Sequence, residues 1–227
     1  MGTVGVNSRR SAGAREIAMA VDRIIFIVDD DPRMRNSLSG LFDSMGIANM
    51  VFASANEYVA AEKPDTVSCL LLDVHLPDLS GLEFQENLGR TEHPPIIFMT
   101  AYGDIPSSVK AMKAGAIDFL PKPFQPQDLM RAVHEAFERD QKARRSRAET
   151  AELRGRYASL TPRECEVLPL IVGGLLNKQA AAELGIAEIT CQVHRGQIMR
   201  KLAAGSLAEL VRMAATLGIS PVGRPKG

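Results

Sequence analysis

Short apolar runs alternate with stretches of helical periodicity over residues 23–140, and this alternation constrains the fold more than any other feature of the chain. The apolar runs that we interpret as strands are Ile24–Val28, Ala48–Phe52, Ser68–Leu72, Pro95–Thr100 and Ala116–Leu120. Helical periodicity is clearest after the first run, where apolar side chains recur every three or four positions, at Met34, Leu38, Leu41, Phe42 and Met45. Strands separated by helices predict an α/β fold with a doubly wound, five-stranded parallel sheet.

Carboxylates stand at the ends of two of these expected strands. Asp29 and Asp30 directly follow the first run, and Asp73 directly follows the third, in the stretch LLLDVHLPD. The carboxyl ends of parallel strands share one rim of the sheet, so we expect these acids to converge there, with Thr100 from the fourth run. Carboxylates so gathered repel one another unless a cation lies among them, and oxygen ligands suit Mg²⁺. Lys122, in FLPKPF, can add a fixed positive charge, and the X–Pro bond that follows it is a candidate for the cis isomer.

The net charge of zero conceals an uneven distribution along the chain. Residues 19–140 carry 10 Lys and Arg against 19 Asp and Glu, residues 141–156 carry 6 against 2, and residues 157–227 carry 8 against 5. An acidic first part suits a bound cation, and a basic second part suits a polyanion such as nucleic acid. A chance distribution of charge over solvated surface is the alternative.

Cysteine usage and hydropathy indicate the compartment. Cys69, Cys165 and Cys191 are odd in number and lack metal-ligand spacing, which fits a reducing environment. No apolar run approaches the roughly 18 residues that a membrane span needs. We therefore expect a soluble, cytoplasmic protein with no membrane partner. Residues 1–22 and 221–227 are expected to be disordered, and Met19 is an alternative start to Met1.

A second pattern begins near Leu160. Thr161 is suited to cap a helix and Glu164 to close a capping box, with proline at the first helical position between them. A short helix over 177–184, a turn at Gly185 and a longer helix over 188–202 then predict helix-turn-helix geometry.

Four blocks, VDDDP, LLLDVHLPDLSG, PIIFMTAYGD and KAGAIDFLPKPF, resemble the receiver domain of two-component response regulators in their order and separation. The resemblance implies a flavodoxin-like fold in which a sensor histidine kinase phosphorylates Asp73. It also implies a Mg²⁺ ion bound by Asp29, Asp30, Asp73 and the backbone carbonyl of His75. For Asp73 considered alone, a helix cap or a loop acid is the simpler interpretation.

The same resemblance implies roles for residues near the phosphorylated group. Thr100 would hydrogen-bond the phosphoryl group and Lys122 would pair with it. Phe119 would be an aromatic switch that turns inward on phosphorylation, although an ordinary core phenylalanine is the alternative. The face built from residues 105–115 and 127–137 would then change and support dimerisation.

The stretch LTPRECEVLPLIVGGLLNKQAAAELGIAEITCQVHRGQIMRKL resembles the LuxR-type DNA-binding domain. Together with the receiver blocks it resembles the NarL/FixJ family of response regulators over residues 23–217, and GDIPSSVKAMKAGAIDFLPKPF favours the FixJ-like branch. The resemblance implies that the helix from Glu188 enters the major groove. The expected DNA contacts are Lys178, Gln192, Val193, Arg195, Gly196, Arg200 and Lys201. Gln192 stands where many relatives carry Lys, and its amide can pair with adenine.

The expected architecture is a receiver domain over 23–140, a helical linker over 141–156 and a helix-turn-helix domain over 157–220. A flexible charged linker is the alternative for the middle segment. We expect a transcription regulator, not an enzyme, whose phosphorylation promotes homodimerisation and binding to an inverted repeat, with RNA polymerase as a further partner and activation as the more usual outcome. One alternative is DNA binding that does not depend on phosphorylation. Another is an aspartyl-phosphate phosphohydrolase of the haloacid dehalogenase type, but its second acid would fall at His75.

Overall fold

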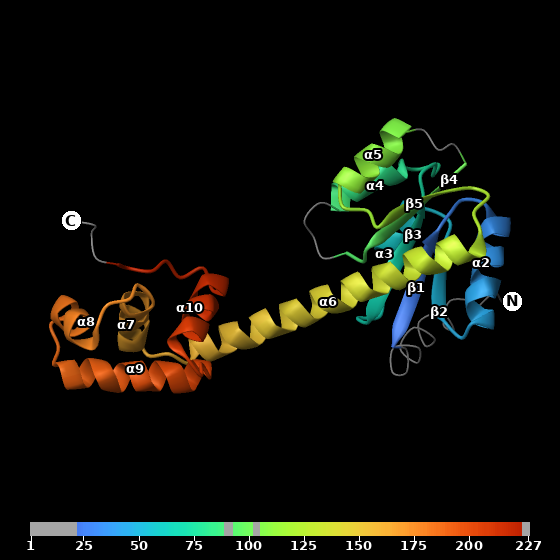
Figure 1. Cartoon of the computed structure of the whole chain (residues 1–227). Helices are drawn as coiled ribbons and strands as arrows, with labels where there is room; N and C mark the ends of the chain where they lie inside the picture. The colour runs from blue at the N-terminus through green and yellow to red at the C-terminus, as the bar shows by residue number, and fades with distance from the viewer. Residues whose placement is uncertain (1–21, 89–92, 102–104, 224–227) are drawn as a thin grey trace, which may run out of the picture. The chain divides into compact units, whose positions relative to one another are not determined.

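The computed structural model describes residues 22–88, 93–101 and 105–223, and Figure 1 shows the course of the chain. The chain divides into two compact units, the first ending at Arg144 and the second beginning at Arg145. Of the two ends expected to be disordered, residues 1–21, with Met19, and residues 224–227 lie outside the described residues. Val222, in the described part of the second end, donates its N–H to the carbonyl of Pro169 at 2.9 Å. No helix among the residues described is long and apolar enough to cross a membrane.

The amino-terminal unit contains a parallel five-stranded sheet in the order β2-β1-β3-β4-β5. Its strands are β1 (Arg23–Val28), β2 (Ala48–Phe52), β3 (Val67–Asp73), β4 (Ile96–Thr100) and β5 (Asp118–Pro121). The helices of this part of the chain are α2 (Pro32–Ser44), α3 (Ala55–Ala60), α4 (Gly81–Leu88), α5 (Ile105–Lys113) and α6 (Pro126–Ala158). The prediction of a doubly wound flavodoxin-like fold is confirmed.

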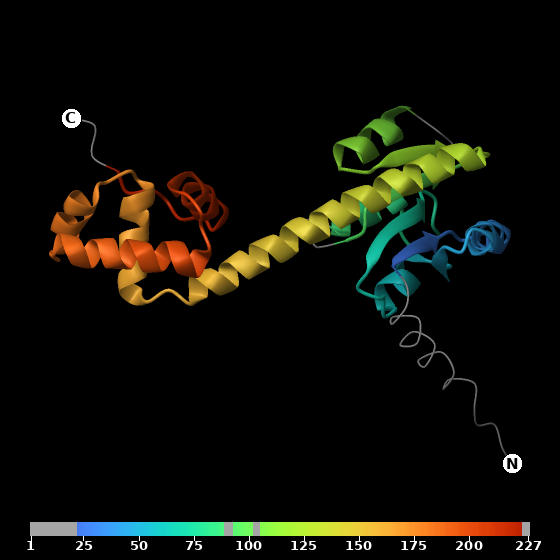
Figure 2. The ribbon, with the colours of Figure 1, turned by 60° about the horizontal axis from the view of Figure 1, so that its bottom comes forward.

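Helices cover both faces of the sheet because the strands are apolar on both faces (Figures 1 and 2). Successive side chains of a strand point to opposite faces. On β1, Phe26 packs in a cluster with residues of α3, α4 and α5, whereas Ile25 and Ile27 pack in a second cluster with residues of α2 and α6. A fully buried sheet fixes the strand ends and therefore the side chains that follow them.

Four of the five strands differ from the expected runs by one or two residues at an end, and the largest shift is at the start of the fifth. The fifth strand begins at Asp118 and not at Ala116. Gly115, with φ at +95°, ends the preceding helix, and the Ala116 N–H donates back to the carbonyl of Ala111 at 3.1 Å. The backbone of Ala116 therefore completes the turn after α5 instead of joining the sheet ladder.

Helix α6 runs without interruption over 33 residues, Pro126–Ala158, and includes residues 141–156. Asp140, on this helix, is 3 % exposed and accepts a hydrogen bond at 2.9 Å from the backbone N–H of Ser68 at the start of β3. Arg144 pairs with Asp140 at 2.7 Å and also with Asp65. These bonds attach the helix to the amino-terminal unit beyond its apolar packing.

The carboxyl-terminal unit contains α7 (Pro162–Val172), α8 (Asn177–Leu184), α9 (Glu188–Leu202) and α10 (Leu207–Thr216). These helices appear from orange to red in Figure 2. The expected capping box is present at the start of α7, and α8 ends at Gly185, whose φ of +63° is left-handed. Helix α9 packs against α7 and α8 around a shared apolar core, which is the helix-turn-helix arrangement expected from the sequence.

Candidate functional site

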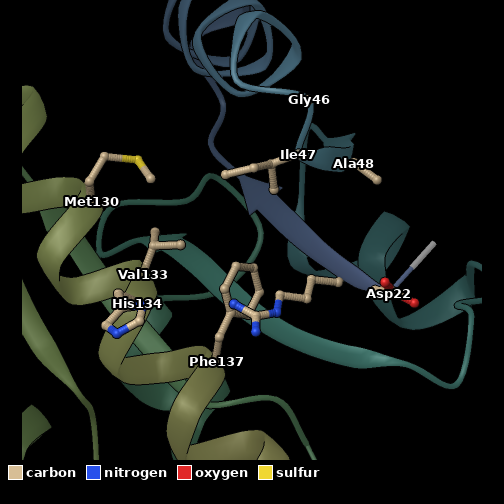
Figure 3. A pocket seen from close by; sticks show the side chains of 9 residues that line it. Asp22, Gly46, Ile47, Ala48, Met130, Val133, His134 and Phe137 are labelled. Atoms are coloured by element: carbon tan, nitrogen blue, oxygen red, sulfur yellow. The ribbon is translucent and has the colours of Figure 1, made fainter.

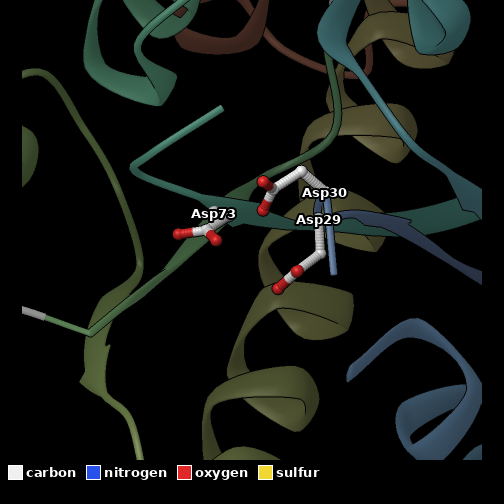
Figure 4. A group of neighbouring side chains, drawn as sticks. All are labelled: Asp29, Asp30 and Asp73. Atoms are coloured by element: carbon white, nitrogen blue, oxygen red, sulfur yellow. The ribbon is translucent and has the colours of Figure 1, made fainter. Parts of the chain in front are cut away.

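Three aspartates meet at the carboxyl rim of the sheet (Figure 4). Asp29 is fully buried after β1, Asp73 ends β3 and is 6 % exposed, and Asp30 is exposed to solvent. One ligand oxygen from each lies within 4.8 Å of the others. We refer to Asp29, Asp30 and Asp73 as the acidic cluster. The convergence follows from the topology, because β1 and β3 are neighbours and parallel.

Backbone hydrogen bonds hold the two buried carboxylates in place. The N–H of Asp31 donates to Oδ1 of Asp29 at 2.9 Å, and the N–H of His75 donates to Oδ1 of Asp73 at 3.2 Å. Asp31 has a different task, since its own carboxylate caps α2 through the N–H of Arg33 at 2.8 Å. The sequence analysis missed this cap, although an aspartate directly before a proline is a usual helix start.

Lys122 joins the two buried members of the acidic cluster. Its Nζ lies 2.7 Å from Oδ2 of Asp29 and 2.9 Å from Oδ2 of Asp73, and its side chain is 14 % exposed. The Lys122–Pro123 bond is cis. Burial alone would lower the pKa of Lys122, but its hydrogen bonds to the two carboxylates raise that pKa above its ordinary value. The ammonium group therefore stays charged.

The charge at this rim is not balanced. Three carboxylates face one ammonium group, which leaves two negative charges when all are ionised. Burial raises the pKa of Asp29, and the nearby ammonium of Lys122 only partly opposes this effect. Oxygen ligands with excess negative charge, open to solvent on the side of Asp30, fit a hydrated Mg²⁺ ion.

Two further residues predicted for this site also lie on neighbouring strands. Thr100 is fully buried at the end of β4, and its carbonyl accepts a hydrogen bond from the N–H of Lys122 at 2.6 Å. Phe119 is half-buried on β5, with its ring centroid 6.1 Å from that of Phe98 on β4. His75 is exposed beside Asp73.

Gly81 supports the site and was missed in the sequence analysis. It begins α4, and its N–H donates to the carbonyl of Val74 at 2.9 Å. A Cβ atom at this position would lie 2.4 Å from the carbonyl oxygen of Asp73. Only glycine allows the helix to approach the strand end so closely. The pair Ser80-Gly81 before a helical stretch was the available signal.

The residues predicted to contact DNA fall into two groups. Lys178, Gln192, Val193, Gly196 and Arg200 are exposed, with all but Lys178 on α9. The other two, Arg195 and Lys201, are partly buried and bonded within the unit.

Lys201 makes two contacts within the carboxyl-terminal unit. Its ammonium lies 2.7 Å from Oε2 of Glu164 and 3.1 Å from the carbonyl of Ser159, so it joins α9 to the start of α7. Its side chain is 24 % exposed, and its contact with DNA phosphates stays a prediction. Arg195 donates to Oδ1 of Asn177 at 3.2 Å, which ties α9 to α8.

Figure 3 shows a cavity of about 580 Å³. Its lining residues stand at the amino ends of β1 and β2, whereas the acidic cluster lies at the carboxyl rim of the sheet. The cavity is lined by Asp22 and Arg23 before and at the start of β1, by the residues leading into β2, and by α6. The guanidinium of Arg23 lies 5.7 Å from the ring centroid of Phe137. None of its lining residues belongs to the acidic cluster, so this cavity is separate from the site described above.

A doubly wound sheet with clustered acids at its carboxyl rim, followed on the same chain by a helix-turn-helix unit, defines a signalling protein that acts on DNA. The response regulator receiver domain family matches residues 25–134. The luxR family of bacterial regulatory proteins matches residues 158–214. The chain belongs to the response regulators that combine a receiver domain with a LuxR-type DNA-binding domain.

Relatives match the chain across both parts. Nodulation protein W of Bradyrhizobium diazoefficiens is 52 % identical over 198 residues, which are 87 % of each chain. The response regulator TodT of Pseudomonas putida is 42 % identical over 86 % of each chain. The transcriptional regulatory protein FixJ of B. diazoefficiens is 39 % identical over 86 % of this chain and 96 % of its own.

Solved structures agree with this family. The response regulator StyR matches with a TM-score of 0.74 and 44 % identity over 86 % of this chain and 99 % of its own. Full-length FixJ from B. japonicum matches with a TM-score of 0.52 and 38 % identity, over 88 % of this chain and 99 % of its own. A receiver joined to a LuxR-type domain implies a histidine kinase and DNA as partners. The predicted family is therefore confirmed.

Proposed function

We propose that Asp73 is the phosphoryl acceptor and that its modification controls DNA binding by the carboxyl-terminal unit. The observation that carries this proposal is the acidic cluster, with Lys122 bonded to both of its buried members at 2.7 and 2.9 Å. Burying several like charges together lowers the stability of the folded state. A site for phosphoryl transfer accounts for such a cluster.

The chain's own residues suffice to position the acceptor. The N–H of His75 holds one oxygen of Asp73, and Lys122 holds the other. A carboxylate oxygen of Asp73 would attack the phosphorus of a phosphohistidine on the kinase. The new P–O bond forms as the P–N bond breaks, and the histidine leaves with its electron pair. Lys122 would then pair with a phosphoryl oxygen, and the hydroxyl of Thr100 would donate to another.

We assign Mg²⁺ to the acidic cluster, with Asp29, Asp30, Asp73 and the carbonyl of His75 as its protein ligands. A bound Mg²⁺ ion supplies charge neutralisation for the incoming phosphoryl oxygens. The oxygen-only donor set and the excess of two negative charges support this assignment.

Phosphorylation would act on DNA binding through dimerisation. As Thr100 moves toward the phosphoryl group, Phe119 on the adjacent strand would turn inward and alter the face formed by residues 105–115 and 127–137. Two copies would then present two α9 helices to an inverted repeat, with a gain in affinity from the high effective concentration of the second. We propose activation of transcription through RNA polymerase, in the cytoplasm, as the outcome.

The experiment uses the purified full chain and a pool of genomic fragments, with Mg²⁺ and with or without beryllofluoride as a mimic of the phosphoryl group. We expect dimer formation and enrichment of a short inverted repeat only when the mimic is present. Asp73→Asn should abolish both effects. Asp78→Asn is the matched control, because it changes an exposed acid of the same loop outside the acidic cluster.

Two outcomes decide between the proposals. Equal enrichment with and without the mimic would mean that DNA binding is independent of phosphorylation, which is the alternative that keeps the same fold. Turnover of small phosphate esters would favour a phosphohydrolase. Exposed His75 occupies the position where the acid of haloacid dehalogenase enzymes would stand, and this supports a regulator without enzymatic activity.

A further inference from the structure

Helix α9 carries apolar side chains on two opposite faces. One face supplies Cys191, Ile198 and Leu202 to the core, and all three are fully buried. The opposite face is an exposed stripe at helical spacing, formed by Ile189, Gln192, Val193, Gly196 and Arg200. We call these five residues the α9 stripe.

Two members of the α9 stripe are large and apolar although they face solvent. Ile189 is 66 % exposed and Val193 is 54 % exposed, and they lie one helical turn apart. Single exposed apolar side chains are ordinary on soluble proteins. Here the two apolar side chains are neighbours and share their face with the amide of Gln192 and the cation of Arg200. Together they form an exposed patch suited to binding a partner.

The charged and amide side chains near this patch indicate which ligand it can bind. One guanidinium nitrogen of Arg195 donates to Asn177, and the ammonium of Lys201 is bonded to Glu164. Gln192 lies between the two apolar residues, and its amide can pair with adenine. Arg200 at the far end of the stripe and Lys178 on α8 are exposed cations suited to phosphates.

We infer that Ile189 and Val193 bind thymine methyl groups in the major groove, so that the protein selects A·T base pairs opposite the first half of α9. The inference rests on the proposed DNA binding through α9 and adds Ile189, which the sequence analysis did not single out. The C5-methyl of thymine is the apolar group that the major groove displays, and isoleucine and valine have no other means of distinguishing bases.

The helix geometry predicts where the thymines lie. Residues four apart on a helix are separated by roughly 6 Å along its axis. Base pairs are stacked about 3.4 Å apart along the duplex. Ile189 and Val193 therefore contact thymines one or two base pairs apart, with an adenine within reach of Gln192.

The test uses the full chain with Mg²⁺ and beryllofluoride. A preferred duplex is first selected from a random pool, and each of its thymines is then replaced in turn by deoxyuridine, which removes one methyl and keeps every hydrogen bond. We expect affinity to fall about fourfold at each contacted thymine, the equivalent of one buried carbon group. In Ile189→Ala, deoxyuridine at one of these thymines should no longer lower the affinity. In Val193→Ala, the same should hold for another of the thymines.

Val211→Ala is the matched control, because Val211 is 39 % exposed on α10 and away from the α9 stripe. It should keep the full sensitivity to deoxyuridine whatever its effect on overall affinity. Ile189→Val removes a single methylene. Its sensitivity to deoxyuridine should lie between that of the unaltered protein and that of Ile189→Ala.

The outcomes separate this inference from the function on which it rests. Selective DNA binding that is indifferent to every deoxyuridine substitution would overturn the thymine contacts and leave the proposed function intact. Deoxyuridine sensitivity that persists in both alanine variants would show that other residues contact the methyl groups. Failure to select any duplex would count against the proposed function.

Discussion

Each unit of the molecule contains a partly buried lysine with two oxygen partners, yet the two clusters differ in charge. Lys122 contacts two carboxylates of the acidic cluster, at 2.7 and 2.9 Å. Lys201 contacts one carboxylate, that of Glu164, at 2.7 Å, and the neutral carbonyl of Ser159 at 3.1 Å. The first cluster carries uncompensated negative charge, and the second is balanced one to one.

The comparison shows that burial and ion pairing alone do not mark a functional site. Glu164, like Asp73, is buried, and the carboxylate of each accepts one backbone and one lysine hydrogen bond. The partners of Glu164 are Thr161 in the same capping box and Lys201 on α9, and they balance its charge. Excess negative charge at the rim of a sheet is stabilised when a cation binds there. We therefore expect the two clusters to respond differently to Mg²⁺ and to the loss of their lysines.

The largest expected effect concerns Mg²⁺ binding. Asp29→Asn removes one charge from the acidic cluster, and we expect Mg²⁺ affinity measured by isothermal titration calorimetry to fall on the order of 100-fold. Glu164→Gln removes an equally buried carboxylate from the balanced cluster and should leave Mg²⁺ affinity unchanged. Equal affinities for Asp29→Asn and the unaltered protein would contradict the assignment of the ion.

The second prediction contrasts the two lysines. Lys201→Ala leaves Glu164 buried without its cation, and we expect a loss of about 2 kcal/mol, below the values for fully buried pairs because the Lys201 side chain is 24 % exposed. Lys122→Ala should also destabilise its unit. Millimolar Mg²⁺ should restore the lost stability, because the ion replaces the missing positive charge.

Hydrogen exchange of the amides of β1, α7 and α9 in the full chain measures both effects unit by unit. Lys201→Met is the control for side-chain packing, since methionine keeps an aliphatic stem but has no charge. The two clusters would not differ as we expect if Mg²⁺ restored the stability of Lys201→Ala, or if it failed to restore that of Lys122→Ala.

The smallest expected effect is a pH dependence in the carboxyl-terminal unit. Burial alone would raise the pKa of Glu164, but the ammonium of Lys201 and the donors of Thr161 lower it below its ordinary value. A carboxyl whose pKa is lowered on folding stabilises the folded state at pH values above its unfolded pKa, near 4.3. That contribution is lost as the pH falls through the folded pKa.

Glu164→Gln should therefore lower the stability of α7 by about 1 kcal/mol at neutral pH, the usual size of an N-cap contribution, and by less at pH 3. Exchange rates of α7 amides at the two pH values test this. A difference that stays constant between them would mean that the charge of Glu164 does not contribute.

Much of the molecule could be predicted from the sequence. The convergence of Asp29, Asp30, Asp73, Thr100 and Lys122 at one rim followed from the alternation of strands and helices, because parallel strands all end at the same edge. The bounds of α8 and α9 and the capping box of α7 were also predictable, since caps and turns depend on neighbours a few residues away.

The tertiary structure alone decided which side chains bond to one another across the fold. The sequence marks Lys122 and Lys201 equally as basic residues, and it does not show that Lys201 is bonded to Glu164, 37 residues away. It likewise does not show that Arg195 is bonded to Asn177, or that a Cβ at Gly81 would collide with the carbonyl of Asp73. Periodicity and caps reflect the energetics of adjacent residues, whereas these contacts depend on how separate helices and strands pack. The sequence therefore determined the fold and the place of the acidic cluster, and packing decided which charged groups are paired within the fold and which apolar groups stay exposed.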